Sequence, residues 1–395
     1  SNGLEKRPKL RFPGFDEPYK QCRIGDIYAE RSQRGASDME LLSVTMNDGV
    51  KPRSEIEGKD NSSEDKSNYK IVRKGDMVYN SMRMWQGANG ISPCDGIVSP
   101  AYTVLMPKQE INNGYFAALF KSVTLINEFR KNSQGMTSDT WNLKYPQIET
   151  IKVQIPSVSE QDKVSELFSV LDERIATQAQ LVESLKKYKR GVVRTLLSPK
   201  HFSIKNVKWT TSRIGDIGTF IKGAPLSKAD ISLEGTPFIL YGELYTTYNE
   251  VISNVVRKTQ ASVDKQYYSQ IGDVIIPTSG ETPEEISTAS CVMLPDIILA
   301  GDLNIYRCTQ VDGRIMSYIL NHVVNDRIAR IAQGKSVVHV QAAELSKIEI
   351  TYPDPFSQKT IIAILAAISD RIDQSNAELR LLHELRKALL QKLFI

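Results

Sequence analysis

The sequence contains little of what builds metal sites or membrane spans. Its 395 residues include only four cysteines and four histidines, and no CxxC pair or HExxH spacing occurs among them. Because zinc sites depend on such spacings, we expect no metal site. No run approaches the roughly 20 apolar residues that cross a membrane. Sparse cysteines and the lack of a recognisable signal peptide favour a cytoplasmic protein that binds no membrane.

Motifs for catalysis are also missing. No P-loop GxxxxGK[ST] is present. Asp354-Pro355-Phe356 lacks the second proline of the Asn/Asp-Pro-Pro-aromatic motif of DNA methyltransferases, and no acid–x–Lys pair follows Pro295-Asp296 at the spacing of a nuclease. The sequence therefore predicts no catalytic residue. The net charge of +4 permits nucleic-acid binding but does not demand it.

An internal repeat fills almost half the chain in each copy. The segment from Gln161 onward aligns without a gap with the segment from Gln358 onward, at an offset of 197 residues. Upstream, four shorter segments recur in the same order: residues 23–27 as 213–217, 75–78 as 272–275, Gln134-Gly135 as Gln333-Gly334, and 151–156 as 348–353. Between these anchors the copies diverge, most strongly over residues 28–70 and 218–270. The predicted organisation is a duplicated domain followed by a duplicated helix.

The two helices carry apolar rows with heptad spacing, which we call the seam. Rows sustained over about five heptads are typical of a coiled coil, although two unrelated amphipathic helices that each cover their own domain would also be apolar on one side. Polar residues interrupt the rows at matching places, Gln178 with Ser375 and Lys189 with Arg386, which favours pairing of the helices. The residues predicted to form the seam are Val164, Phe168, Leu171, Ile175, Val182, Leu185, Ile361, Leu365, Ile368, Ile372, Leu379 and Leu382.

The predicted fold class is α+β: two mixed α/β domains in a pseudo-two-fold repeat, separated by two long antiparallel coiled-coil helices. The predicted boundaries are 1–157 for the first domain, 158–200 for its helix, 201–355 for the second domain and 356–395 for its helix. A helix of roughly 36 residues spans about 54 Å. Dimeric DNA readers hold their reading elements about 34–36 Å apart, so helices of this length could space two readers.

The order of local phrases resembles that of the specificity subunits of Type I restriction–modification systems. These phrases are residues 7–15, 75–88 with 98–102, 276–282 with 300–303, and the helix ends 185–191 and 382–388. The resemblance implies that each domain is a target-recognition domain that reads one half of a bipartite, asymmetric site in double-stranded DNA, without catalysis. It also implies that two methyltransferase subunits dock on the helices and that two restriction/translocase subunits join for cleavage. S-adenosylmethionine, ATP and Mg²⁺ would then belong to those partners, and this chain would hold no cofactor.

Polar loops that follow a strand or a helix are the candidates for DNA contact. Base edges need hydrogen-bonding side chains, and phosphates need cations or small hydroxyls. The candidates are Asn80, Ser81, Arg83, Gln86, Gln134, Thr137, Ser138 and Asp139 in the first domain, and Thr278, Ser279, Glu281, Thr282, Gln333, Lys335, Ser336 and His339 in the second. Solvated loops with ordinary turn chemistry would have the same composition. The Gly-Asp pairs such as Gly75-Asp76 are predicted to be turns rather than sites.

The role of the basic segment from Lys186 to Lys200 stays open. It could contact DNA between the half-sites, meet a partner subunit or form a solvated helix face.

Two alternatives stay open for the whole chain. They are a coiled-coil scaffold that binds only protein and a stand-alone DNA methyltransferase or nuclease. The scaffold gives no reason for two divergent domains of equal size, and the enzymes lack their motifs.

Overall fold

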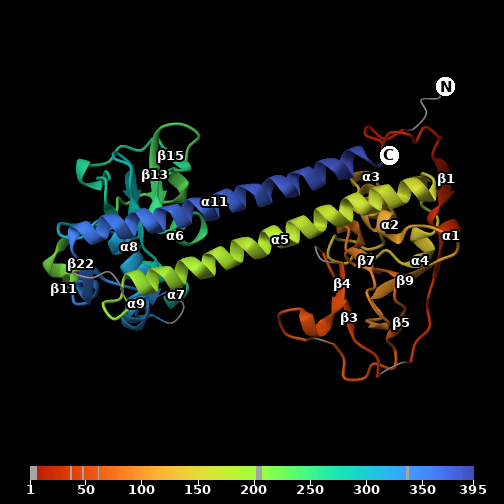
Figure 1. The fold of residues 1–395 in the computed structure, drawn as a ribbon, viewed down its shortest axis with the longest axis horizontal. Helices are drawn as coiled ribbons and strands as arrows, with labels where there is room; N and C mark the ends of the chain where they lie inside the picture. The colour runs from red at the N-terminus through yellow and green to blue at the C-terminus, as the bar shows by residue number, and fades with distance from the viewer. Residues whose placement is uncertain (1–6, 36–37, 47–48, 61, 202–206, 335–337) are drawn as a thin grey trace. The chain divides into compact units, whose positions relative to one another are not determined.

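The computed structural model of the chain describes residues 7–35, 38–46, 49–60, 62–201, 207–334 and 338–395. Its internal contacts divide the chain into two compact units. Unit 1 consists of Ser1–Gln180 together with Ala377–Ile395, and unit 2 consists of Leu181–Asn376. Each unit therefore holds one mixed domain and one end of each long helix (Figure 1).

Unit 1 is built around a four-stranded antiparallel sheet in the order β2-β9-β6-β7, beside the pairs β1-β10, β3-β4 and β5-β8. Aromatic side chains from the first helices fill its core, where Phe116 and Phe120 meet Tyr28, and Phe120 also meets Phe129 edge-to-face at 5.6 Å. The elements are β1 Lys20–Arg23, α1 Ile24–Ile27, β2 Tyr28–Glu30, β3 Leu42–Thr45, β4 Gly49–Pro52, η1 Arg53–Glu55, β5 Lys70–Val72, β6 Met77–Asn80, η2 Met84–Gln86, β7 Asn89–Ile91, β8 Gly96–Val98, β9 Tyr102–Pro107, α2 Asn113–Leu119, α3 Val123–Asn132, α4 Tyr145–Ile148, β10 Lys152–Ile155 and the start of α5 Val158–Leu196.

Unit 2 has a five-stranded sheet in the order β12-β20-β16-β18-β14, a three-stranded sheet β15-β13-β19, and the pairs β11-β22 and β17-β21. Helix α8 covers the central strands with a nearly continuous buried face from Ile315 to Leu320. The elements are β11 Trp209–Arg213, η3 Ile214–Asp216, β12 Gly218–Lys222, η4 Lys228–Asp230, β13 Thr236–Leu240, α6 Glu243–Thr246, β14 Val251–Ile252, β15 Arg257–Thr259, η5 Lys265–Tyr267, β16 Asp273–Pro277, β17 Ser279–Gly280, α7 Pro283–Ile286, β18 Ser290–Val292, β19 Ile298–Ala300, β20 Leu303–Cys308, α8 Gly313–His322, α9 Asn325–Ile331, β21 Val338–His339, α10 Ala342–Leu345, β22 Glu349–Pro353 and the start of α11 Pro355–Lys392.

The two copies of the repeat share equivalent strand pairs and equivalent single hydrogen bonds. The β1–β10 pair of unit 1 corresponds to the β11–β22 pair of unit 2. At the start of each long helix a buried glutamine ties the helix to its domain. The Gln161 side chain donates to the Pro156 carbonyl (3.1 Å) and accepts from the Asn112 backbone N–H (3.0 Å). Gln358 makes the same two bonds, to Pro353 (2.9 Å) and from Asp312 (2.8 Å). The predicted α+β fold with two repeated mixed domains is confirmed.

The long helices pair within each unit. In unit 1, Phe168 of α5 stacks on Phe394 just after α11 (5.9 Å), and Asp172 and Arg174 form ion pairs with Arg386 and Glu378, so the helices run antiparallel there (Figure 1). In unit 2, the other ends of α5 and α11 share one apolar core. All twelve predicted seam residues are buried or half-buried, the buried ones being Val164, Phe168, Leu171, Val182, Ile361, Leu365 and Ile372.

Helix α5 ends earlier than predicted. It stops at Leu196 instead of residue 200. The cause is Pro199, because the ring of a proline disfavours helical geometry in the residue before it.

Candidate nucleic-acid interface

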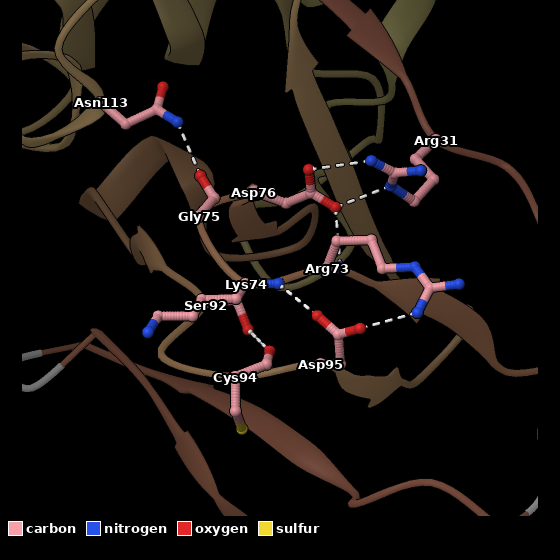
Figure 2. Close-up of polar contacts among 9 residues, drawn as sticks. All are labelled: Arg31, Arg73, Lys74, Gly75, Asp76, Ser92, Cys94, Asp95 and Asn113. Carbon is pink, nitrogen blue, oxygen red and sulfur yellow. Dashed lines mark hydrogen bonds and ion pairs between the residues drawn. The ribbon is translucent and has the colours of Figure 1, made fainter.

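The strand that carries the first predicted loop begins at a turn held by hydrogen bonds and an ion pair. The Asp76 carboxylate accepts the Arg73 backbone N–H (2.8 Å) and pairs with Arg31 (2.7 Å), while Asn113 donates to the Gly75 carbonyl (2.6 Å; Figure 2). The pKa of Arg31 is raised because its guanidinium donates to this carboxylate. Gly75-Asp76 is therefore a structural turn, as the sequence predicts, that fixes where β6 starts.

A second carboxylate, that of Asp95, also binds this turn. Asp95 accepts the Lys74 backbone N–H (2.8 Å) and pairs with the Arg73 guanidinium (2.7 Å; Figure 2), and both bonds hold its pKa below the ordinary value. In the second domain Asp273 caps the corresponding turn through the Gln270 backbone N–H (2.8 Å) and pairs with Arg307 (3.1 Å). In both domains an aspartate that pairs with an arginine therefore fixes the turn before the central strand.

In the first domain the two predicted loops adjoin. The Leu143 backbone N–H donates to the Ser81 carbonyl (2.9 Å), and the rings of Trp85 and Trp141 meet edge-to-face at 5.3 Å. The Arg130 guanidinium lies over Trp85 at 5.5 Å. The loop after β6 and the loop after α3 therefore form one surface that carries both aromatic and cationic groups.

The loop after α3 has a fixed shape. Gln134 and Asn142 form an antiparallel bridge, and between them Gly135 takes a φ of +142°. The Thr140 side chain bonds to the backbone of Thr137, which closes the turn. Gln134, Thr137, Ser138 and Asp139 are all exposed on it.

In the second domain the two predicted loops are joined by a short sheet. Ser279 of β17 pairs with His339 of β21, and Gln333 bridges to His339, which corresponds to the Gln134 bridge of the first domain. Gly334 has a φ of +138°, close to that of Gly135. Lys335 and Ser336 lie outside the described residues.

Individual candidates differ in what they offer to a ligand. Ser81 and Ser279 are about 4–5% exposed, and their hydroxyls bond within the domain to Thr103 and Asp302, which removes both serines from the residues expected to reach DNA. Asn80 and Thr278 are half-buried. The exposed candidates are Arg83, Gln86, Gln134, Thr137, Ser138, Asp139, Glu281, Thr282, Gln333 and His339.

Two of these side chains also serve the fold. The Thr282 hydroxyl caps α7 by accepting the Glu285 backbone N–H (3.2 Å), and the Asn80 side chain accepts from the Met82 backbone N–H (3.0 Å). In the basic segment Lys189 is not free for DNA, because its side chain is 12% exposed and pairs with Glu250 (2.7 Å). Lys186 pairs with Glu183 (2.8 Å) on the same helix.

Reasoning from the sequence missed Asp302 and Lys222. Both line a groove of about 770 Å³ beside Thr278 and His339. The phrase 300–303 carries the family resemblance without assigning a role to Asp302, and only the register of β16, β20 and β12 brings Asp302 and Lys222 beside the predicted loops.

Within the described part of the chain, no group of three or more His, Cys, Asp or Glu side chains is placed to bind a metal ion. None of the helices described is long and apolar enough to cross a membrane.

Comparisons with known proteins agree with this architecture. A family model for the Type I restriction modification DNA specificity domain matches the chain twice, over residues 17–187 and 206–383. The Type I restriction enzyme MjaVIII specificity subunit of Methanocaldococcus jannaschii is 23% identical over 354 residues, which cover 82% of this chain and 79% of that subunit.

Solved structures show the same fold. The Type I restriction–modification S subunit from M. genitalium superposes with a TM-score of 0.61 at 15% identity, over 98% of this chain and 99% of that one. A chain from work on complex assembly and conformational transition of the Type I system also has a TM-score of 0.61, at 14% identity and the same coverage. Because the family model accounts for both halves of the repeat, the chain belongs to the Type I restriction–modification DNA specificity family.

Proposed function

We propose that each domain reads one half of a bipartite, asymmetric site in double-stranded DNA through its two adjoining loops. Members of this family are the non-catalytic recognition subunits of Type I systems and assemble with other subunits. The observation that carries the proposal is a shared scaffold with unlike side chains. The bridges Gln134–Asn142 and Gln333–His339 are equivalent, yet the amino-acid sequences that they enclose differ. Side chains at base edges specify sequence, so unlike loops would read unlike half-sites.

Selection from a randomised DNA library tests this with the chain assembled with its methyltransferase partners. The wild-type complex should recover a two-part motif. Gln86→Ala should change the preferred bases in one part only, and His339→Ala in the other part only. Gln270→Ala, an exposed glutamine outside the loops, should change neither. A single substitution that alters both parts contradicts reading by separate domains.

The same preparation separates the alternatives. A scaffold that binds only protein would show no salt-sensitive DNA affinity, whereas phosphate contacts make binding fall steeply with salt. A stand-alone methyltransferase would transfer methyl groups from S-adenosylmethionine to DNA without any partner. We expect salt-sensitive binding and no methyl transfer by the isolated chain.

The helices are the proposed spacer and docking surface for two methyltransferase subunits. Tyr188 of α5 and Leu385 of α11 are separated by the repeat offset of 197 and are 60% and 49% exposed. Large apolar side chains left exposed at equivalent points of a repeat support two equivalent docking sites. The wider proposal is a cytoplasmic complex with two restriction/translocase subunits, in which S-adenosylmethionine, ATP and Mg²⁺ bind the partners.

Measuring the mass of the assembled complex tests these two docking sites. Tyr188→Ser and Leu385→Ser should each remove one methyltransferase subunit, and the double variant should remove both. Leu233→Ser, which changes a 97% exposed leucine away from the helices, should keep the full mass. Retention of both subunits by the double variant would exclude these two positions from the interface.

A further inference from the structure

Among its described lining residues, a groove in the second domain lacks the cluster of cations that a phosphate backbone would need. It has a volume of about 770 Å³, with Phe220, Pro225 and Leu226 among its apolar lining residues. Among the residues described, its charged groups are a single cation, Lys222, and a single carboxylate, Asp302. Tracts that bind phosphates gather several cations. The groove therefore favours a neutral, hydrogen-bonding partner.

Asp302 is held in place and its second carboxylate oxygen is available. One oxygen accepts the Ser279 hydroxyl (2.7 Å), and that serine is 5% exposed in the short β17–β21 sheet. The Thr278 backbone N–H donates to the Asp302 carbonyl (2.8 Å). Asp302 is exposed and forms no ion pair with any described residue. Its position is fixed, but its charge is not neutralised within the described protein.

The carboxylate is not needed to build this turn. The registers pair Asn80 with Tyr102 in the first domain and Pro277 with Leu303 in the second, so Ala101 is the counterpart of Asp302. The same backbone bond forms there, from the Ser81 N–H to the Ala101 carbonyl (3.4 Å). A side chain that is dispensable for the shared turn, and that differs between the two readers, is available for recognition.

We propose that Asp302 reads an exocyclic amino group, the N4 amino of cytosine or the N6 amino of adenine, at one position of the half-site bound by the second domain. This inference rests on the proposed function. An ionised carboxylate can only accept hydrogen bonds, and among base edges in the major groove only these two amino groups donate. Thymine and guanine present oxygen at the corresponding place and would be repelled.

The test compares wild-type and Asp302→Asn complexes in the library selection. Asparagine has the same shape and keeps a partner for Ser279, but it no longer presents two acceptors. The wild-type complex should favour an amino-bearing base by roughly tenfold at one position, and the variant should keep less than about twofold. The rest of the motif, including the half read by the first domain, should not change. Asp264→Asn, the same change at an exposed aspartate outside the groove, should leave every position as in the wild type.

Synthetic duplexes then identify the base. If it is cytosine, replacement by thymine should weaken wild-type binding about tenfold. If it is adenine, replacement by purine, which lacks the amino group, should have the same effect. Neither replacement should weaken the Asp302→Asn complex.

Three outcomes decide the matter. An unchanged motif in Asp302→Asn overturns the role of Asp302 while leaving DNA reading intact. Loss of binding to every sequence by a folded variant also overturns it, because one base contact cannot account for a uniform loss. A wild-type complex that selects no motif refutes the proposed function itself.

Discussion

Replacing Glu250 should destabilise the attachment of α5 to the second domain. The Glu250 carboxylate bridges Lys189 of α5 (2.7 Å) and His322 of α8 (2.7 Å), and all three side chains are 12–16% exposed. Lys189 also lies over the Tyr318 ring at 5.3 Å. Burial acts to raise the pKa of Glu250, but the hydrogen bond with His322 and the charge of Lys189 outweigh it and lower the pKa from 4.5 to about 2. The ionised form is therefore strongly favoured in the folded unit.

The pKa shift gives the size and the pH range of the effect. At 1.36 kcal/mol per pKa unit, a fall from 4.5 to about 2 corresponds to about 3 kcal/mol of folding stability. Because the folded pKa is the lower one, this contribution is complete above pH 4.5 and is lost as the pH falls towards 2. Glu250→Gln should therefore lower the free energy of unfolding of unit 2 by about 3 kcal/mol at pH 7, and by about 1.5 kcal/mol near pH 3.

Urea unfolding followed by fluorescence measures this, with Trp85 and Trp141 replaced by phenylalanine so that Trp209 reports on unit 2. Glu234→Gln, at an exposed site, is the control and should cost less than about 0.5 kcal/mol. Adding Lys189→Met to Glu250→Gln should restore most of the loss, since no unpaired cation then stays buried. A loss below about 1 kcal/mol at pH 7, or one independent of pH, would refute the reasoning.

Four further substitutions have defined outcomes. Gln161→Ala and Gln358→Ala each leave a buried carbonyl and a part-buried N–H without their partner, and each should cost about 1–3 kcal/mol in urea unfolding; a cost near zero would mean that the glutamines do not fix the helices. Gly135→Ala places a Cβ 2.6 Å from the Thr140 carbonyl at a φ of +142°, and should weaken selection of the first half-site while the second is retained. Arg83→Ala should reduce the slope of log affinity against log salt by about 0.9 if the guanidinium meets a phosphate, or relax one base if it meets a base edge; no change in either excludes Arg83 from the interface.

The repeat and the helices could be predicted because their signals are periodic. The heptad rows recur at matching positions in the two copies. The gapless match from Gln161 and Gln358 marks helices that start with the same hydrogen bonds. The place of the loops could also be predicted, since a Gln-Gly pair ends each helical stretch, and the structure adds a β-bridge at Gln134 and at Gln333.

Partners across the tertiary structure could not be predicted. Lys189 and Arg386 interrupt the heptads at matching positions, yet Lys189 pairs with Glu250 of the domain, whereas Arg386 pairs with Asp172 of the other helix. Sequence spacing fixes which face of a helix a residue occupies, but what lies opposite depends on packing. The same limit hid Asp302, which is 23 residues from the serine that holds it.

The division of the chain has a consequence for the order of synthesis. The apolar core of unit 1 includes Leu393 and Phe394. Unit 1 therefore lacks part of its core until the far end of α11 has been synthesised. Residues 181–376, which contain all of unit 2, are synthesised in between. At 5–20 residues per second, the nascent first domain waits roughly 10–40 s with part of its apolar core incomplete. Chaperone demand during translation should therefore fall on the first of the two domains, and truncation before Leu393 should harm that domain rather than the nearer one.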